Sequence, residues 1–180
     1  MYTDGKFVLQ QKQMVMKQKT ASTRMEAIND LYDLHKLYFQ NVLEGIKDTD
    51  AHNRLGTKAN HIAWLAGSLV QQRFELANML GIEGTQKAAD LFKDNKGIQE
   101  HTTYPPLEQY KEDWNNISPQ LKEALERVTD EKLDSSFEMM PGMQMTHYEL
   151  ITFIIYREAN CIGQIALWRR LLGYEPMKYI

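Results

Sequence analysis

The chain has very little cysteine, since Cys161 is the only one among 180 residues. One thiol excludes an internal disulfide framework and any zinc motif built from several cysteines, and it favours a reducing compartment. Long apolar runs are also missing, because none approaches the roughly 20 residues that are needed to span a bilayer. The N-terminal stretch lacks the apolar core of a signal peptide. We therefore expect a cytoplasmic protein with no membrane partner.

The sequence also has no excess of positive charge. Lysine and arginine number 21 against 24 acidic residues, which gives a net charge of −3 and a pI near 6.0. A protein of this charge offers no electrostatic attraction for nucleic acid, so we expect none as a partner. The length of 180 residues with 43% hydrophobic composition suits one compact domain with a substantial core.

Runs of alternating β-branched residues are absent, whereas four stretches repeat apolar residues at helical spacing. They cover about residues 22–47, the segment from Gly56-Thr57 to Gly81, the segment that follows Pro106, and the segment from Thr146 to just before Gly173. The third stretch keeps its apolar phase across Pro119, which predicts one kinked helix rather than two. Thr146 and Glu149 form a capping-box pattern at the start of the fourth. The sequence thus predicts an all-α, antiparallel four-helix bundle.

The connections between these helices differ in length. Residues 82–105 form a long link between helices two and three, with a short helix expected at 88–92, and links of this length often carry binding loops. Residues 135–145 are rich in methionine and read as an irregular segment that covers one end of the bundle. Residues 1–20 are predicted to form an arm or a short extra helix before a single bundle domain at 21–180.

Arg157 and Cys161 are the most informative pair in the chain. They lie four residues apart on one helical face, among apolar residues of the fourth helix. Because a charge is costly to bury without a partner, the pair indicates a polar pocket within the bundle. Cys161 is read first as a small buried hydrophobe, and a nucleophilic role would require a lowered pKa that Arg157 could supply.

Two histidines lie on helices that face the same interior. His61 lies near the start of the second helix, and His35 falls within the apolar stripe of the first. For both, a hydrogen-bonded structural role competes with a role as a metal ligand. His52, His101 and His147 are expected to be solvated or capping. The sequence contains no serine–histidine–aspartate order, no phosphate-binding glycine loop and no His-Glu-x-x-His motif.

Three segments give the chain a family resemblance. They read Asn60-His-Ile-Ala-Trp-Leu-Ala-Gly67, Glu158-Ala-Asn-Cys-Ile-Gly-Gln-Ile165 and Arg169-Arg-Leu-Leu-Gly173. Together with the helix order and the long link, they resemble the DinB/YfiT-like superfamily. The resemblance implies a four-helix bundle that is often dimeric. It also implies, for many members, a zinc or nickel ion held by one histidine of helix two and a His-x-x-x-His pair of helix four. Some members use that metal to transfer a low-molecular-weight thiol, and others are known only as folds.

Carried over to this chain, the family's ligand positions fall on His61, Arg157 and Cys161. A thiolate at Cys161 is a suitable zinc ligand, but arginine has no lone pair to donate and stays protonated. A guanidinium about 5 Å from a divalent cation would be repelled by about 7 kcal/mol at an effective dielectric constant of about 20. We therefore expect no metal cofactor. In its place, Arg157 would hold an anion or a carboxylate.

Three hypotheses remain open from the sequence. The first is a metal-free bundle that binds a small anionic or polar molecule around His61, Arg157 and Cys161. The second is a thiol S-transferase with zinc or nickel held by His61, Cys161 and a third ligand such as His35. The third is a structural or interaction bundle, in which an internal carboxylate neutralises Arg157 and a homodimer surface carries the function. Whether the chain is an enzyme, and which residues would be catalytic, stays open.

Overall fold

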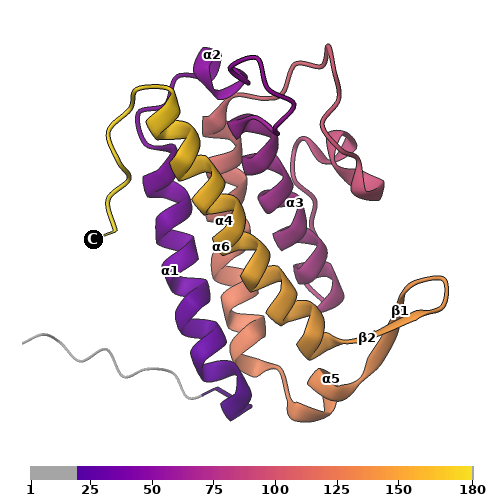
Figure 1. Ribbon diagram of the computed structural model, residues 1–180. Helices are drawn as coiled ribbons and strands as arrows, with labels where there is room; N and C mark the ends of the chain where they lie inside the picture. Colours follow the sequence, from indigo (N-terminus) through magenta and orange to yellow (C-terminus); the bar gives the residue numbers. More distant parts are fainter. Residues whose placement is uncertain (1–19, 180) are drawn as a thin grey trace, which may run out of the picture.

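The computed structural model describes residues 20–179, and these residues are mainly helical (Figure 1). The α-helices are α1 (Glu26–Leu43), α2 (Asp48–Ala51), α3 (Ile62–Met79), α4 (Leu107–Arg127), α5 (Asp130–Asp134) and α6 (His147–Leu171). Short 3₁₀ turns lie at Thr23–Met25, Ala89–Leu91 and Lys93–Asn95. The predicted arm, except for Thr20, lies outside the described residues.

The four long helices α1, α3, α4 and α6 lie side by side and enclose one apolar core (Figure 1). The all-α four-helix bundle predicted from the sequence is therefore confirmed. The long link at 82–105 returns the chain along the bundle, so α3 and α4 run in the same direction. Antiparallel contacts join α3 to α6 and α1 to α4, while α1 and α6 run in parallel.

Local sequence signals explain most of the helix boundaries. Thr146 and Glu149 form the predicted capping box, in which each side chain satisfies a free amide of the other residue. Helix α4 continues through Pro119 as one helix, as its apolar phase predicts. Helix α3 begins at Ile62, so His61 is its N-cap residue rather than a residue of its first turns.

Residues 135–145 differ from the prediction. They are not an irregular cover but a two-stranded antiparallel hairpin, with β1 at Ser136–Met140 and β2 at Met143–Thr146. Pro141 and Gly142 form the turn, and Gly142 has a φ of +80°, which favours glycine. Met140 is 55% exposed and Met143 is 44% exposed, so these methionines do not seal the end of the bundle. The hairpin projects from the bundle in Figure 1.

The long link packs closely against α3 at Gly67. A Cβ at Gly67 would come within 2.2 Å of the Phe92 ring and 2.7 Å of the Tyr110 ring, so glycine is required for this approach. Gln86 donates a hydrogen bond to the Gly67 carbonyl oxygen at 3.1 Å. Ala89–Leu91 forms a 3₁₀ turn within the segment where a short helix was predicted. The link is therefore packed along α3.

Helix α6 is long and apolar enough to cross a membrane by length and composition alone. In the bundle, however, its core-facing residues pack against α1 and α3. The core helix of a water-soluble bundle has the same composition, so we assign α6 to the core.

Candidate ligand-binding clefts between α3 and α6

A buried ion pair joins α3 to α6 at the centre of the bundle. Arg73 donates to Glu158 through Nε at 2.6 Å and through Nη2 at 2.9 Å, and both side chains are almost fully buried. His35 of α1 lies on the other side of the carboxylate, with Nδ1 3.2 Å from Oε2. The three helices α1, α3 and α6 are thus tied through one carboxylate.

Further contacts hold the Arg73 guanidinium in place. It lies over the rings of Trp114 and Tyr32, at 3.3 and 4.1 Å from their centroids, and donates to the Ser118 hydroxyl at 2.6 Å. Burial opposes the ionisation of Glu158, but the charge and hydrogen bonds of Arg73, with the bond from His35, hold the pKa of this carboxyl below its usual range. The pair is therefore an internally neutralised unit of the core.

Arg73 was not identified from the sequence. A signal was present, because Arg73 lies four residues after Leu69 and three before Leu76, on the apolar stripe of α3. A charged residue within such a stripe needs a buried partner of opposite charge. Glu158 of α6 is that partner, but nothing in the sequence alone indicates that it contacts Arg73.

Arg157 has very different partners. It is partly buried and donates from Nη1 to Gln72 Oε1 at 2.8 Å and from Nη2 to Ser68 Oγ at 2.6 Å. Among residues 20–179, no carboxylate lies within ion-pair distance of its guanidinium. The third hypothesis paired Arg157 with an internal carboxylate, but the buried carboxylate of Glu158 is bonded to Arg73 instead. Arg157 thus keeps its positive charge with only neutral hydrogen-bond partners.

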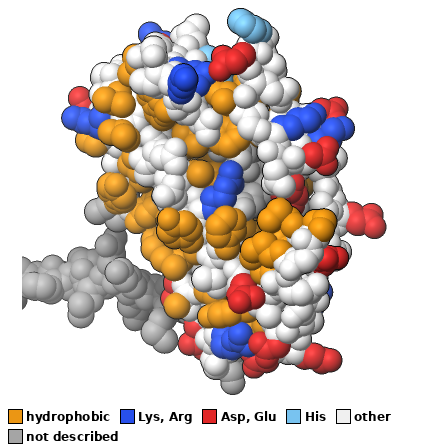
Figure 2. Space-filling model, turned by 45° about the vertical axis from the view of Figure 1, so that its right-hand side comes forward, with side chains coloured by type: hydrophobic (Ala, Val, Ile, Leu, Met, Phe, Trp, Pro, Cys, Tyr) orange, Lys and Arg blue, Asp and Glu red, His pale blue; other side chains and the backbone are white. Residues whose placement is uncertain are grey.

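Arg157 lines a cleft between α3 and α6, which we call the apolar cleft. Its volume is about 450 Å³. The apolar members of its lining are Trp64, Leu76, Met79, Phe92, Met139, Leu150, Phe153 and Ile154. The polar members are Ser68, Gln71, Gln72, Glu75, Asn95, Lys96 and Arg157. In Figure 2, apolar side chains cover much of the middle of the molecule with basic ones between them, and acidic side chains gather toward the lower edge.

A second cleft of about 360 Å³ adjoins the first, and we call it the amide cleft. It is lined by Asn60, Trp64, Leu65, Phe153, Tyr156, Arg157, Asn160, Cys161 and Gln164. Burial raises the pKa of the Cys161 thiol, and the opposing effect of Arg157 is too small to reverse this. Cys161 is therefore a thiol at neutral pH, without the activation that a nucleophile requires.

The structure brings Arg157 and Cys161 to one cleft, but His61 contacts a different set of residues. His61 Nδ1 accepts the N-cap hydrogen bond from the Trp64 amide at 3.0 Å. Its ring lies 5.2 Å from that of His52 and 5.0 Å from that of Tyr104, measured between centroids. Burial, followed by the effect of His52, lowers the pKa of His61 to about 4. His35, the suggested third ligand, is bonded to Glu158.

The residues that the resemblance places at the family's ligand positions do not form a suitable metal-binding set. Arg157 has no lone pair, the Cys161 thiol is held protonated, and the Nδ1 lone pair of His61 already accepts a backbone hydrogen bond. Within the described part of the chain, no three His, Cys, Asp or Glu residues are grouped as ligands. The donor chemistry therefore does not fit the family's metal.

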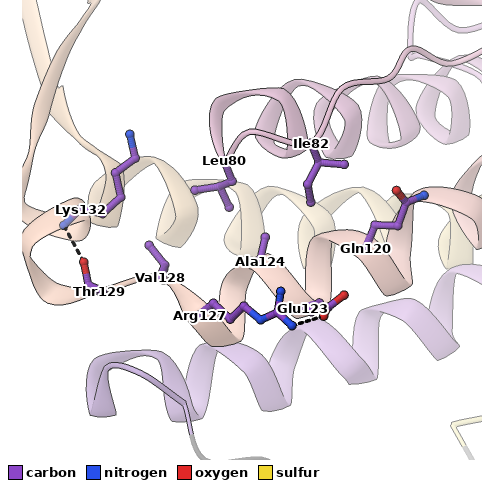
Figure 3. A pocket seen from close by; sticks show the side chains of 9 residues that line it. All are labelled: Leu80, Ile82, Gln120, Glu123, Ala124, Arg127, Val128, Thr129 and Lys132. Carbon is purple, nitrogen blue, oxygen red and sulfur yellow. Dashed lines mark hydrogen bonds and ion pairs between the residues drawn. The ribbon is translucent and has the colours of Figure 1, made fainter.

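A third cleft lies between the C-terminal ends of α3 and α4 (Figure 3). Leu80, Ile82, Ala124 and Val128 supply apolar side chains, and Arg127 forms an ion pair with Glu123. The Thr129 side chain caps α5 by accepting from the Lys132 amide at 3.3 Å. The polar groups drawn in Figure 3 are thus largely bonded to one another. None of the site residues predicted from the sequence, His61, Arg157 and Cys161, lines this cleft.

These observations define a helical bundle with a long crossover link and two adjoining clefts between its second and fourth long helices. A model of the DinB family matches residues 39–179, and the chain belongs to this family. Among solved structures, it resembles a conserved protein from Enterococcus faecalis with a TM-score of 0.62 and 12% identity, over 82% of this chain and 96% of the other. At that identity the likeness shows the fold alone. No curated protein sequence matches the chain.

Proposed function

We propose that this DinB family protein binds a small anionic molecule in the apolar cleft, with Arg157 as the anchor for the anion and without a bound metal. The observation that carries the proposal is the set of Arg157 partners, which are the neutral side chains of Gln72 and Ser68. A guanidinium stays protonated at all physiological pH values, so its charge is available to a ligand.

The two neutral partners prepare Arg157 for this role. They fix one hydrogen on each of two guanidinium nitrogens, and the remaining N–H groups are available to a carboxylate or phosphate oxygen. A side chain that is already held in place loses little conformational entropy when a ligand binds. The surrounding apolar side chains also reduce the screening of the charge by water.

The other charges in the cleft favour a single negative charge on the ligand. Arg157 and Lys96 are two cations, and Glu75 is the one carboxylate in the lining, which leaves one net positive charge. Lys96 donates to the Asp90 carbonyl oxygen at 3.1 Å, and Glu75 accepts from Gln71 at 2.9 Å. A monoanion with an apolar body matches this balance.

Octanoate and octanamide test the proposal, because they differ in charge but hardly in size. Calorimetric titration should show that the wild-type protein binds octanoate about tenfold more tightly than octanamide, and that Arg157→Gln removes this preference. Arg170→Gln is the matched control, since Arg170 is an exposed arginine on the same helix and lines neither cleft. Equal affinities of the wild type for the two probes, or a preference that survives in Arg157→Gln, would overturn the proposal.

We also propose that the protein is a cytoplasmic homodimer, with α1 and α6 forming the interface. Leu31 and Leu34 of α1 are 44% and 42% exposed, and Leu167 and Leu171 of α6 are 59% and 57% exposed. A Cβ at Gly163 of α6 would meet nothing within 4 Å, so this surface also has room for a close neighbour. Apolar side chains on two adjacent helices favour association with a second copy.

A further inference from the structure

The apolar cleft and the amide cleft adjoin each other at three shared residues. Trp64, Phe153 and Arg157 appear in the lining of both. A ligand group held by Arg157 would therefore lie where the two clefts meet. A molecule that extends in both directions from that group would enter both clefts.

The two linings differ in chemistry. Beyond the shared residues, the apolar cleft has six apolar and six polar side chains, but apolar atoms make up most of the surface that it exposes. The amide cleft instead presents Asn60, Asn160 and Gln164. Gln164 donates to Asn160 Oδ1 at 2.6 Å, which leaves the Asn160 amide hydrogens and the Gln164 carbonyl oxygen for another partner. This cleft thus offers both donors and acceptors to a polar group.

Trp64 supplies a separate observation at the junction. Its indole Nε1–H is buried and has no hydrogen-bond acceptor among the described residues. Buried donors without an acceptor are uncommon in folded proteins and cost free energy. The residue that lines both clefts therefore carries one buried polar group without a partner among the described residues.

We infer that the ligand has two arms joined at its anionic group, namely an apolar arm for the apolar cleft and a carboxamide- or hydroxyl-bearing arm for the amide cleft. This inference rests on the proposed function and specifies its ligand class. N-Acyl derivatives of polar amino acids have this architecture, because the carbon that bears the carboxylate joins the acyl arm to the polar side chain.

N-Octanoyl-L-glutamine is the test molecule, compared with octanoate, which lacks the polar arm, and with N-acetyl-L-glutamine, which lacks the apolar arm. Calorimetric titration of the wild-type protein should show that N-octanoyl-L-glutamine binds about tenfold more tightly than either. Asn160→Leu and Gln164→Leu should each reduce this advantage over octanoate while leaving octanoate affinity unchanged. Asn116→Leu, which removes an exposed amide from α4, is the control and should leave the advantage intact.

The outcomes separate the two proposals. If octanoate binds through Arg157 but N-octanoyl-L-glutamine binds no more tightly, the two-armed ligand is wrong and the anion site stands. An advantage that persists in both Asn160→Leu and Gln164→Leu would also overturn it, because the gain would arise outside the amide cleft. If octanoate shows no preference over octanamide, the proposed function fails first, and this inference fails with it.

Discussion

Glu158 accepts two hydrogen bonds from Arg73, at 2.6 and 2.9 Å, in the fully buried centre of the bundle. The preceding residue, Arg157, points to the clefts and has no carboxylate at ion-pair distance within the described chain. Neighbouring positions on α6 therefore face different surroundings, since successive helical residues are rotated by about 100°. The Glu158 charge is paired within the core, whereas the Arg157 charge has only neutral hydrogen-bond partners.

Glu158→Gln should destabilise the protein strongly. The substitution keeps the size of the side chain but leaves the buried Arg73 charge without a counter-ion, which typically costs about 3–5 kcal/mol. Urea unfolding measures the loss. Glu123→Gln removes the partner of Arg127 in an exposed ion pair and should change the free energy of unfolding by less than about 1 kcal/mol. Comparable losses of stability from the two substitutions would show that the buried Arg73–Glu158 pair does not stabilise the core.

His61 should make stability fall in mildly acidic solution. Its pKa is about 4 in the folded protein against an ordinary value of 6.5, so the unfolded chain binds the proton more readily between these values. The free energy of unfolding should therefore decrease as the pH falls from about 6.5 to about 4, by roughly 1 kcal/mol per pH unit from this group.

The His61→Asn variant separates this effect from other titrations. Asparagine is a good N-cap residue for α3 but cannot titrate in this range. Urea unfolding at a series of pH values should show a shallower acid dependence for His61→Asn than for the wild type. Identical slopes between about pH 4 and about pH 6.5 would exclude a lowered pKa of His61.

The protein should carry no stoichiometric zinc or nickel. Arg157, the protonated Cys161 thiol and the capping role of His61 leave too few donors at the family's ligand positions. Elemental analysis of protein purified without chelators measures the content directly. One metal ion per chain, retained through gel filtration, would contradict the metal-free site and favour the thiol transferase hypothesis.

Light scattering coupled to gel filtration should give the mass of a dimer for the wild-type protein. Leu34→Lys should shift the mass toward that of a monomer, because a charge at a buried apolar interface is costly. Leu55→Lys is the control, since Leu55 is similarly exposed at 45% but lies in the connection before α3. A wild-type monomer, or a dimer unaffected by Leu34→Lys, would argue against the α1–α6 interface.

Much of the fold could be predicted from local patterns. The apolar spacing of α4 continues through Pro119, and Thr146 and Glu149 mark the start of α6, so both features follow from short-range chemistry. The hairpin formed by β1 and β2 was missed. Its strands are short and largely exposed, which removes the apolar alternation by which strands are recognised.

The candidate site was only partly predictable. Arg157 and Cys161 share a helical face, so their common cleft follows from spacing. The separation of His61 from this cleft does not follow from spacing. It depends on the N-cap role of His61 and on its contacts with His52 and Tyr104 from other segments. The Arg73–Glu158 pair likewise joins residues 85 positions apart, and only the packing of α3 on α6 reveals it.

The most direct test of the central claim observes the Arg157 side chain itself. In protein labelled with ¹⁵N-arginine, the Nε–H signal of Arg157 is the one missing from the spectrum of Arg157→Gln. Octanoate should shift this signal, with the same half-saturation concentration as in calorimetry, and octanamide should not. An Arg157 signal that stays in place while octanoate saturates the protein would contradict anion binding by Arg157.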